Sequence, residues 1–405
     1  MLTLVTGTAA AQAVGILLQP VLSRLYSPAV TGEMAVYVSI TGIIISIAAL
    51  RYDMTVMLPE SDDDARQLWR LAMTSIAIIS ALTSLGAAIA FPWVQGAYGR
   101  TFALIMLFAG VSVFFVASST AMQFWFNRKE NYRTIAINRA QQTTSILLAQ
   151  IGLGFAGIRT VVGLFVGTLA GQIFAWSTIF RKSKELRAPL SPNALTKRQL
   201  AYRYRKMPLL NGPNTLVDAV RFNGIILLLT ASFGSAVGGE FVKAWALTEA
   251  PVALLNGAIA QVFFQRLART ERGEMFPLVS SSIKRSLLLG IVPFVVLYLA
   301  APPVVGWYLG VEWQNSGLFA QALVPWLYMQ LTSSPISYIF VVTEKQQIML
   351  IFAVFYAVVP LGFLWLSNLS VLATIQVLAL IMAAMLAIMV VMSMFVAKSY
   401  DQEQV

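Results

Sequence analysis

The sequence predicts an all-α polytopic membrane protein with twelve transmembrane helices in two six-helix bundles related by an internal parallel repeat. Composition is the first indication: the 405 residues are 58% hydrophobic and only 11% charged, whereas a soluble protein carries about 25% charged residues. Eight long runs contain no Asp, Glu, Lys or Arg, and most are long enough to cross a bilayer, which takes about 20 apolar residues. Finally, a basic segment separates two halves that share short motifs.

The expected helices follow one another along the whole chain. They are 2–25, 33–52, 67–92, 101–126, 135–156, 160–180, 208–232, 240–265, 285–308, 316–342, 346–366 and 371–397. The first run starts at residue 2 without a basic segment before it, so it is interpreted as a retained helix rather than a signal peptide. The predicted domains are an N-terminal bundle (1–180), a basic linker (181–207) and a C-terminal bundle (208–405).

Lys and Arg are distributed unevenly between the two sides of the predicted membrane. The segments on one side hold 23 of the 28 basic residues, and the other side holds Arg24, Arg100, Arg159 and Lys243. Cytoplasmic loops carry the excess of positive charge, so both termini are predicted to be cytoplasmic. The same bias explains the net charge of +11, and no nucleic-acid partner is expected.

Two motifs recur in the two halves. "YSPAVTGEM" (26–34) resembles "FGSAVGGEF" (233–241), and "PWVQGAY" (92–98) resembles "PPVVGWY" (302–308). Each half contains an even number of expected helices, so both halves enter the membrane from the same side. Such parallel repeats are typical of transporters that work by alternating access.

Asp218 and Arg221 lie near the middle of the expected helix 208–232, on one helical face. A charge at the bilayer centre costs about 2.5–3.5 kcal/mol, so both must face protein or a water-filled cavity. A purely structural ion pair between them is the alternative to a functional role. Glu33 and Glu240 each follow a glycine near a predicted helix start, which suggests an interaction with the helix dipole.

The first two helices of each half carry most of the charged residues near the membrane, which predicts that they line a central cavity. The residues predicted to bind an anionic substrate are Arg221, Lys243, Arg24, Arg51, Asn223 and Asn256. The residues predicted to couple transport to a cation are Asp218, Glu249 and Asp53.

No catalytic residue, metal site or cofactor is expected. The chain has neither Cys nor His, which removes thiolate chemistry and the commonest proton-transfer side chain. The acidic run "ESDDDAR" (60–66) is interpreted as a solvated turn rather than a metal site. The basic segment 181–206 is interpreted as a linker on anionic lipid headgroups.

Four long stretches resemble the bacterial Wzx-type O-antigen and exopolysaccharide flippases of the multidrug/oligosaccharidyl-lipid/polysaccharide exporter superfamily. They are "LSRLYSPAVTGEMAVYVSITGIIISIAALRYDMTVMLPES" (22–61), "GLFVGTLAGQIFA" (163–175), "ALLNGAIAQVFFQRLAR" (253–269) and "GVEWQNSGLFAQALVPWLYMQLTSSPISYIF" (310–340). The resemblance implies a V-shaped protein of the bacterial inner membrane with a cationic cavity. Its implied substrate is undecaprenyl-diphosphate-linked oligosaccharide, for lipopolysaccharide or exopolysaccharide. Rocking of one half against the other needs no dimer, so a monomer is expected. Coupling to an ion (H⁺ or Na⁺) or to the membrane potential is expected, membrane lipids are expected partners, and the polysaccharide polymerase machinery is a candidate partner.

Three alternatives remain open. A cation-coupled multidrug exporter of the same superfamily is disfavoured because Ala11, Ala13 and Val14 stand where those exporters often carry a coupling Asp. A lipid II flippase usually has two further C-terminal helices. A membrane polymerase or ligase usually places its chemistry in a large outer loop, and the longest predicted here is roughly ten residues.

Overall fold

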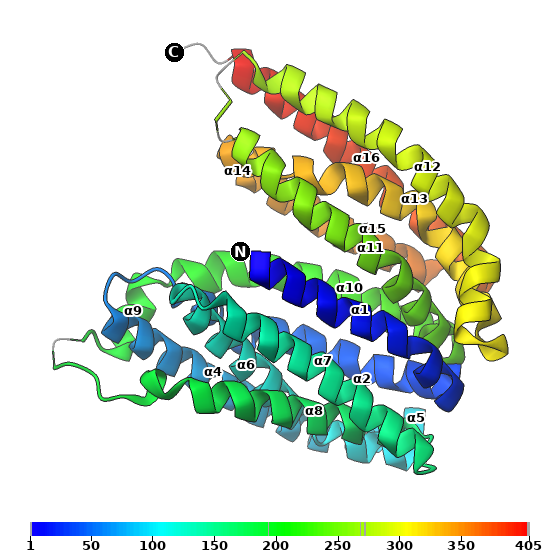
Figure 1. Ribbon diagram of the computed structural model, residues 1–405, viewed down its shortest axis with the longest axis horizontal. Helices are drawn as coiled ribbons and strands as arrows, with labels where there is room; N and C mark the ends of the chain where they lie inside the picture. The colour runs from blue at the N-terminus through cyan, green and yellow to red at the C-terminus, as the bar shows by residue number, and fades with distance from the viewer. Residues whose placement is uncertain (1, 193, 268, 271–272, 403–405) are drawn as a thin grey trace. The chain divides into compact units, whose positions relative to one another are not determined.

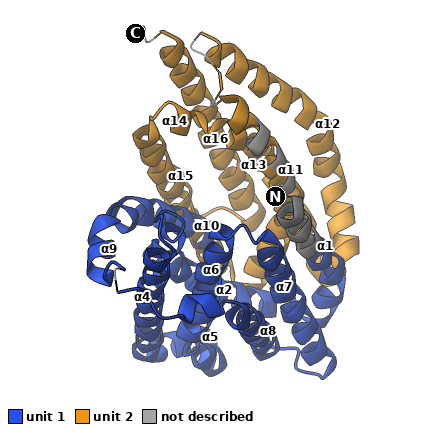
Figure 2. Cartoon of the chain, turned by 60° about the vertical axis from the view of Figure 1, so that its left-hand side comes forward, with its two compact units in different colours: residues 1–223 blue, residues 224–405 orange. Residues whose placement is uncertain are grey.

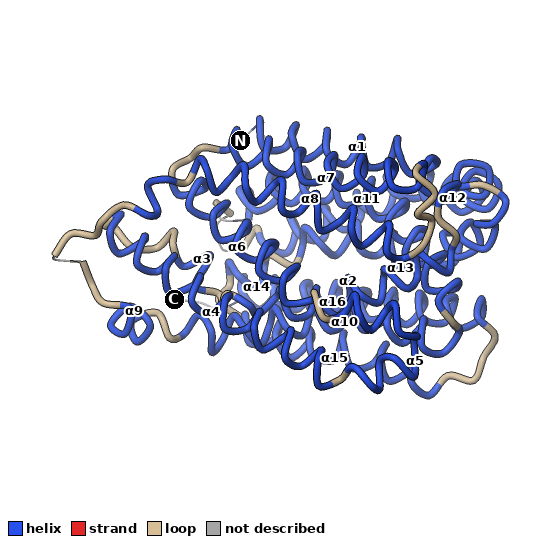
Figure 3. Tube along the Cα trace, turned by 90° about the horizontal axis from the view of Figure 1, so that it is seen from below, coloured by secondary structure: helices blue, strands red, loops and turns tan. Residues whose placement is uncertain are grey.

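A computed structural model of the chain describes residues 2–192, 194–267, 269–270 and 273–402, without the side chains of 2–12, 254–255, 258 and 260–262. Ala11 therefore lies outside the described side chains. All regular structure in the described part is helical (Figures 1 and 3). The chain separates into two compact units, residues 1–223 and 224–405, coloured separately in Figure 2. The predicted division at 181–207 stays a prediction.

The first unit contains most of the helices. In order they are α1 (Leu2–Leu25), α2 (Pro28–Ala48), α3 (Tyr52–Thr55), α4 (Asp62–Ile89), α5 (Phe91–Met106), α6 (Ala109–Arg128), α7 (Tyr132–Phe155), α8 (Val161–Lys182), the short 3-10 helix η1 (Lys184–Arg187), α9 (Lys197–Arg203) and the π-helix η2 (Met207–Asn211). Helix α10 (Gly212–Phe233) begins in the first unit and continues into the second.

The second unit holds longer helices. They are α11 (Ser235–Leu267), α12 (Met275–Leu309), the 3-10 helix η3 (Val311–Trp313), α13 (Gln314–Ile336), α14 (Ile339–Val342), α15 (Gln346–Leu366) and α16 (Val371–Gln402).

Eight helices of the described part are long and apolar enough to cross a membrane. They are α2, α4, α6, α8, α10 with the preceding π-helix, α12, α15 and α16. The chain is therefore a multi-pass membrane protein, as its composition predicts. The remaining four predicted ranges overlap α1, α7, α11 and α13, while the count of twelve crossings and the grouping into two six-helix bundles stay predictions.

Helix starts differ from the predicted ones where capping residues decide them. Helix α2 begins at Pro28, five residues earlier than expected, because the Ser27 hydroxyl accepts a hydrogen bond from the Val30 N–H (3.4 Å) and proline suits the first turn. Helix α11 similarly begins at Ser235. Glu33 and Glu240 thus lie beyond the first turn, so the helix-dipole role predicted for them is wrong.

The expected helix 101–126 is divided in the structure, because α5 ends at Met106 and α6 begins at Ala109. Gly99 has φ 83° and ψ 166° inside α5, and the chain turns again before α6 begins at Ala109. Gly310 has φ 111° and ψ 170° at the end of α12. These two glycines follow the two copies of the second repeated motif, and the copies of the first motif each run into a helix start, at α2 and α11. The repeated sequences therefore share local backbone structure.

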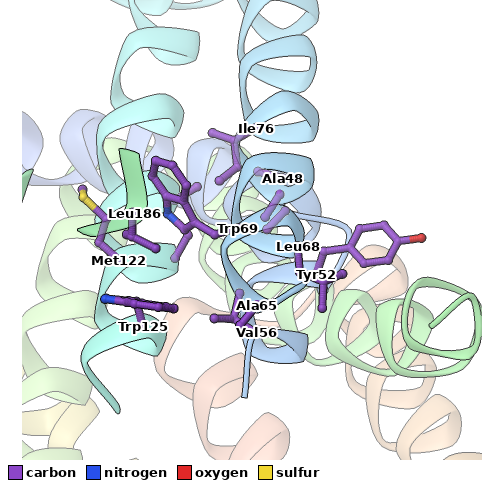
Figure 4. Packing of buried hydrophobic residues seen from close by; sticks show 14 of the residues in the cluster. Ala48, Tyr52, Val56, Ala65, Leu68, Trp69, Ile76, Met122, Trp125 and Leu186 are labelled. Carbon is purple, nitrogen blue, oxygen red and sulfur yellow. The ribbon is translucent and has the colours of Figure 1, made fainter. Parts of the chain in front are cut away.

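The core of the first unit joins α4 and α6 to the basic segment (Figure 4). Leu68 and Trp125 pack there with Leu186 and Leu200, whose side chains are completely buried. The segment is therefore anchored on the core of the first unit, and its predicted contact with anionic lipid stays a prediction. Leu186 and Leu200 provide this anchor because both are buried in the core cluster.

Polar contacts fix the same segment. Asp64 accepts a hydrogen bond from the Leu195 N–H (2.9 Å), and Arg70 donates to the Ala188 carbonyl (2.7 Å). Three residues of the acidic run, Asp62–Asp64, form the first turn of α4, where Asp62 pairs with Arg128 (3.0 Å) and Lys129. Among the described residues, no group of three or more acidic side chains is placed to hold a metal ion.

Candidate functional site

Asp218 and Arg221 form the ion pair that their spacing predicts. Arg221 Nη2 lies 3.6 Å from Asp218 Oδ1 on α10, and the two side chains are 16% and 57% exposed. A pair with one largely exposed partner is worth at most about 1 kcal/mol. The pair alone is therefore a weak reason for placing two charges in an apolar helix. Of the two charged side chains, Arg221 is the more deeply buried.

Two contacts place α10 beside α2 within the first unit. Arg51 Nε donates to Asn211 Oδ1 (3.2 Å) at one end. At the other, a Cβ atom on Gly42 would lie only 3.1 Å from Asn223 Oδ1. The helices run antiparallel between these contacts. Asp218 and Arg221 lie between them along α10, so five of the predicted residues share this helix pair or its ends: Arg51, Asn223, Asp218, Arg221 and Asp53.

Asp53 is buried in the short helix α3, and its Oδ1 has no hydrogen-bond partner among the described residues. Burial raises the pKa of this carboxyl, while the Met54 N–H and the Arg51 charge oppose the rise. Arg51 itself has φ 61°, in the left-handed region, as the residue that precedes α3. This strained turn brings a cation and a buried carboxyl to the end of α2.

Arg24 is not brought to the same place. It lies just before α2 and donates to the Pro20 carbonyl (2.8 Å) in the last turn of α1. Arg51 lies just after α2, whose 21 residues span about 30 Å. The two arginines thus lie at opposite ends of one membrane-length helix and cannot hold the same small group.

In the second unit, Glu249 is the acidic centre of a contact between α11 and α13. Gln330 Nε2 donates to Glu249 Oε1 (2.7 Å). One turn earlier on both helices, the rings of Trp245 and Trp326 meet edge to face at 5.0 Å. Trp326 Nε1 in turn donates to the Tyr356 hydroxyl (2.8 Å) on α15. A carboxylate beside an aromatic wall is therefore built into this unit.

Pro251 follows Glu249 by two residues inside α11. Proline has no N–H, so it cannot donate to the carbonyl four residues earlier. The backbone carbonyl that loses this donor and the Glu249 carboxylate place oxygen atoms on the same stretch of the helix. Asn256 lies two turns further on; it is buried, and its Oδ1 has no hydrogen-bond partner among the described residues.

Lys243 is placed by aromatic and polar neighbours near the start of α11. Its Nζ lies 5.9 Å from the centroid of the Trp313 ring, within range of a cation–π interaction. One turn away, Glu240 accepts from Asn315 Nδ2 with both carboxylate oxygens (3.2 Å each). Lys243 and Glu249 are six residues apart and point to different faces of α11.

Sequence reasoning missed the neutral partners of these charges. Gln330, Asn315 and Trp313 lie in or beside a long run without charges, and no charge signal singles them out. An amide side chain within an apolar run was the available signal, because a buried amide requires hydrogen-bond partners.

The sequence signature described as polysaccharide biosynthesis protein matches residues 21–317. The chain belongs to this family. The family resemblance read from the four quoted stretches is thereby confirmed. No curated protein matches the chain.

Solved structures place this polysaccharide biosynthesis family protein in a known fold. An inward-facing multidrug resistance MATE family transporter of the MOP superfamily superposes with TM-score 0.70 at 12% identity, over 96% of each chain. Lipid II flippase MurJ in an inward closed conformation gives TM-score 0.78 at 11% identity, over 99% of this chain and 90% of that one. A MOP superfamily transporter from Pyrococcus furiosus gives TM-score 0.59 at 13% identity, over 99% and 94%. These three solved proteins are two transporters and a flippase.

Proposed function

We propose that the protein is a flippase that moves undecaprenyl-diphosphate-linked oligosaccharide from the cytoplasmic to the periplasmic leaflet of the bacterial inner membrane. The oligosaccharide is an O-antigen or exopolysaccharide repeat unit. Twelve crossings in two six-helix bundles, with both termini cytoplasmic, complete the proposed topology. The observation that carries the proposal is Arg221, a mostly buried cation in an apolar helix of a polysaccharide biosynthesis family protein.

An arginine at this position suits a diphosphate. Its planar guanidinium donates two parallel hydrogen bonds to phosphate oxygens and stays charged at all physiological pH values. The pair with Asp218 is a weak one, at 3.6 Å with a largely exposed carboxylate. Arg51 and Asn223 on the same helix pair supply further donors, and Lys243 supplies a cation in the second unit. These residues form the proposed substrate set, with Arg24 and Asn256 as its more distant members.

Coupling to H⁺ or Na⁺ is assigned to carboxylates, because oxygen ligands suit both ions. Glu249 has a defined hydrogen bond from Gln330 (2.7 Å) and can exchange it for a cation. Asp218 and Asp53 are the corresponding groups of the first unit. Alternating access then follows if the cation and the substrate bind preferentially to different conformations of the protein.

A cation-coupled multidrug exporter is the second candidate. The ring pair Trp245–Trp326 beside Glu249 is the specific observation in its favour, since aromatic faces and a carboxylate bind lipophilic cations. Arg221, Arg51 and Lys243 favour an anionic substrate instead.

The deciding experiment uses a deletion strain of the native host. Surface polysaccharide and the pool of undecaprenyl-diphosphate oligosaccharide would be measured with wild-type, Arg221→Ala and Arg100→Ala genes returned on plasmids. Loss of polymer and accumulation of the lipid-linked unit in the deletion, rescued by wild type and Arg100→Ala but not by Arg221→Ala, is expected. Arg100 is a matched control because it is an exposed arginine. Unchanged polymer and lipid pools, with new sensitivity to cationic drugs, would support the exporter.

A further inference from the structure

A cavity of about 240 Å³ lies within the second unit, between the C-terminal part of α11 and the first half of α12. It is separate from the residues assigned to substrate or ion. Arg266 lines it from α11 and Arg285 from α12, and none of the described residues that line it is acidic. Its volume corresponds to roughly eight water molecules, enough for a phosphate group and the atoms it esterifies.

The α12 wall of the cavity is one helical face. Leu278, Ser281, Ser282, Arg285, Ser286 and Leu289 line it, at the three- and four-residue spacing of neighbours on a helix surface. Three hydroxyls and a guanidinium therefore form a polar stripe between leucines. Serine hydroxyls rotate and donate to phosphate oxygens, so the stripe and Arg266 offer donors from both helices.

Both guanidinium groups are available to an added anion. The side chains of Arg266 and Arg285 are exposed, and neither takes part in a salt bridge or side-chain hydrogen bond within the described residues. Arg70 and Arg128, by contrast, are held by backbone or carboxylate oxygens. Two cations that line one cavity repel each other, and an anion bound between them removes that repulsion.

The rest of the lining is apolar. Ile259 and Phe263 extend it along α11, and Leu331 closes it from α13. An anion-binding end next to hydrocarbon surface fits a lipid better than a soluble phosphate. We propose that this cavity binds the phosphate headgroup of a membrane lipid, with Arg266 and Arg285 as phosphate ligands and the apolar lining against the lipid chain. The site does not depend on the proposed substrate.

Lipid binding to the purified, delipidated full chain would test this site by native mass spectrometry. Phosphatidylglycerol, undecaprenyl diphosphate and inorganic pyrophosphate would be titrated separately. The double variant Arg266→Gln/Arg285→Gln should weaken lipid binding roughly tenfold or more, because each lost guanidinium removes charge-assisted hydrogen bonds. The lipid that binds more tightly to wild type identifies the source of the headgroup.

The matched control is Arg269→Gln/Lys284→Gln, which removes the same charge from neighbouring residues that do not line the cavity. It should leave lipid affinity within about twofold of wild type. Ser286→Leu fills the cavity without changing charge and should also weaken binding. Equal weakening in both double variants, no weakening in Arg266→Gln/Arg285→Gln, or Arg-dependent binding of pyrophosphate alone would each overturn the proposal. Unchanged gel-filtration profiles exclude misfolding as the cause, and polysaccharide export tests the flippase separately.

Discussion

Replacing Gly171 by alanine tests how closely α7 and α8 must pack. Gly163, Gly167 and Gly171 recur every four residues along α8, which is the small-residue spacing of closely packed membrane helices. A Cβ on Gly171 would lie 2.5 Å from both the backbone N and Cγ1 of Ile146 on α7. Ordinary contact begins at 3.4 Å, so the helices must separate locally by about 0.9 Å.

The magnitude follows from overpacking, which costs about 1–3 kcal/mol. Alanine also has a higher helix propensity than glycine by about 1 kcal/mol, and a control must carry the same gain. Gly152→Ala is that control, because Gly152 lies within α7 and a Cβ there meets nothing within 4 Å. The difference between the two variants is thus the cost of the contact alone.

Thermal unfolding of the full chain in detergent, followed by fluorescence-detected gel filtration, gives the comparison. At roughly 2–4 °C per kcal/mol, Gly171→Ala should melt several degrees below Gly152→Ala. Equal melting temperatures for the two variants would show that α7 and α8 separate locally without loss of stability, and would refute the packing argument.

Three further changes have defined outcomes. Burial raises the pKa of Asp53 in the folded protein. The stability that this residue contributes is therefore fully present below the ordinary Asp pKa of about 3.9, and it is lost as the pH rises through the pKa of the folded state. Asp53→Asn should therefore melt higher than wild type at neutral pH with a flatter profile; superimposable pH–melting curves would contradict this. Asp401 accepts hydrogen bonds from the Gly273, Met275 and Phe276 N–H groups (2.8–3.1 Å) at the start of α12, so Asp401→Ala should cost about 0.5–2 kcal/mol in thermal unfolding, and the exposed Lys398→Ala close to nothing. Glu249→Gln keeps an acceptor for Gln330 but cannot ionise, so export should become independent of an imposed H⁺ or Na⁺ gradient at normal expression; a retained response would remove Glu249 from coupling.

The helices could be predicted from sequence because a spanning helix needs a long apolar run, and such runs are visible without any tertiary information. Their ends were harder, because they depend on single residues: Ser27 starts α2 early and Gly99 interrupts α5. Packing inside the first unit was not predictable at all. Leu186 and Leu200 look like scattered apolar residues in a basic segment, yet both are fully buried.

The same distinction applies to the candidate site. Asp218 and Arg221 were identifiable because a charge in an apolar run is costly wherever the run folds. The partner of Glu249 was not, since a neutral amide such as Gln330 does not stand out in an apolar run. Its role appears only where α13 packs against α11. The distance between Arg24 and Arg51 is likewise a property of α2 as a folded helix.

Positive charge in this chain has two physical uses that composition alone cannot separate. The excess of Lys and Arg on the predicted cytoplasmic side orients the helices, and any basic residue there satisfies that requirement equally. Arg70, Arg128 and Lys197 also bind carbonyl, carboxylate or hydroxyl oxygens of the protein and hold the basic segment and its neighbours in place. Arg266 and Arg285 have no such contact among the described residues, and both line one cavity. Orientation explains their side of the membrane but not their convergence, whereas a bound phosphate explains both.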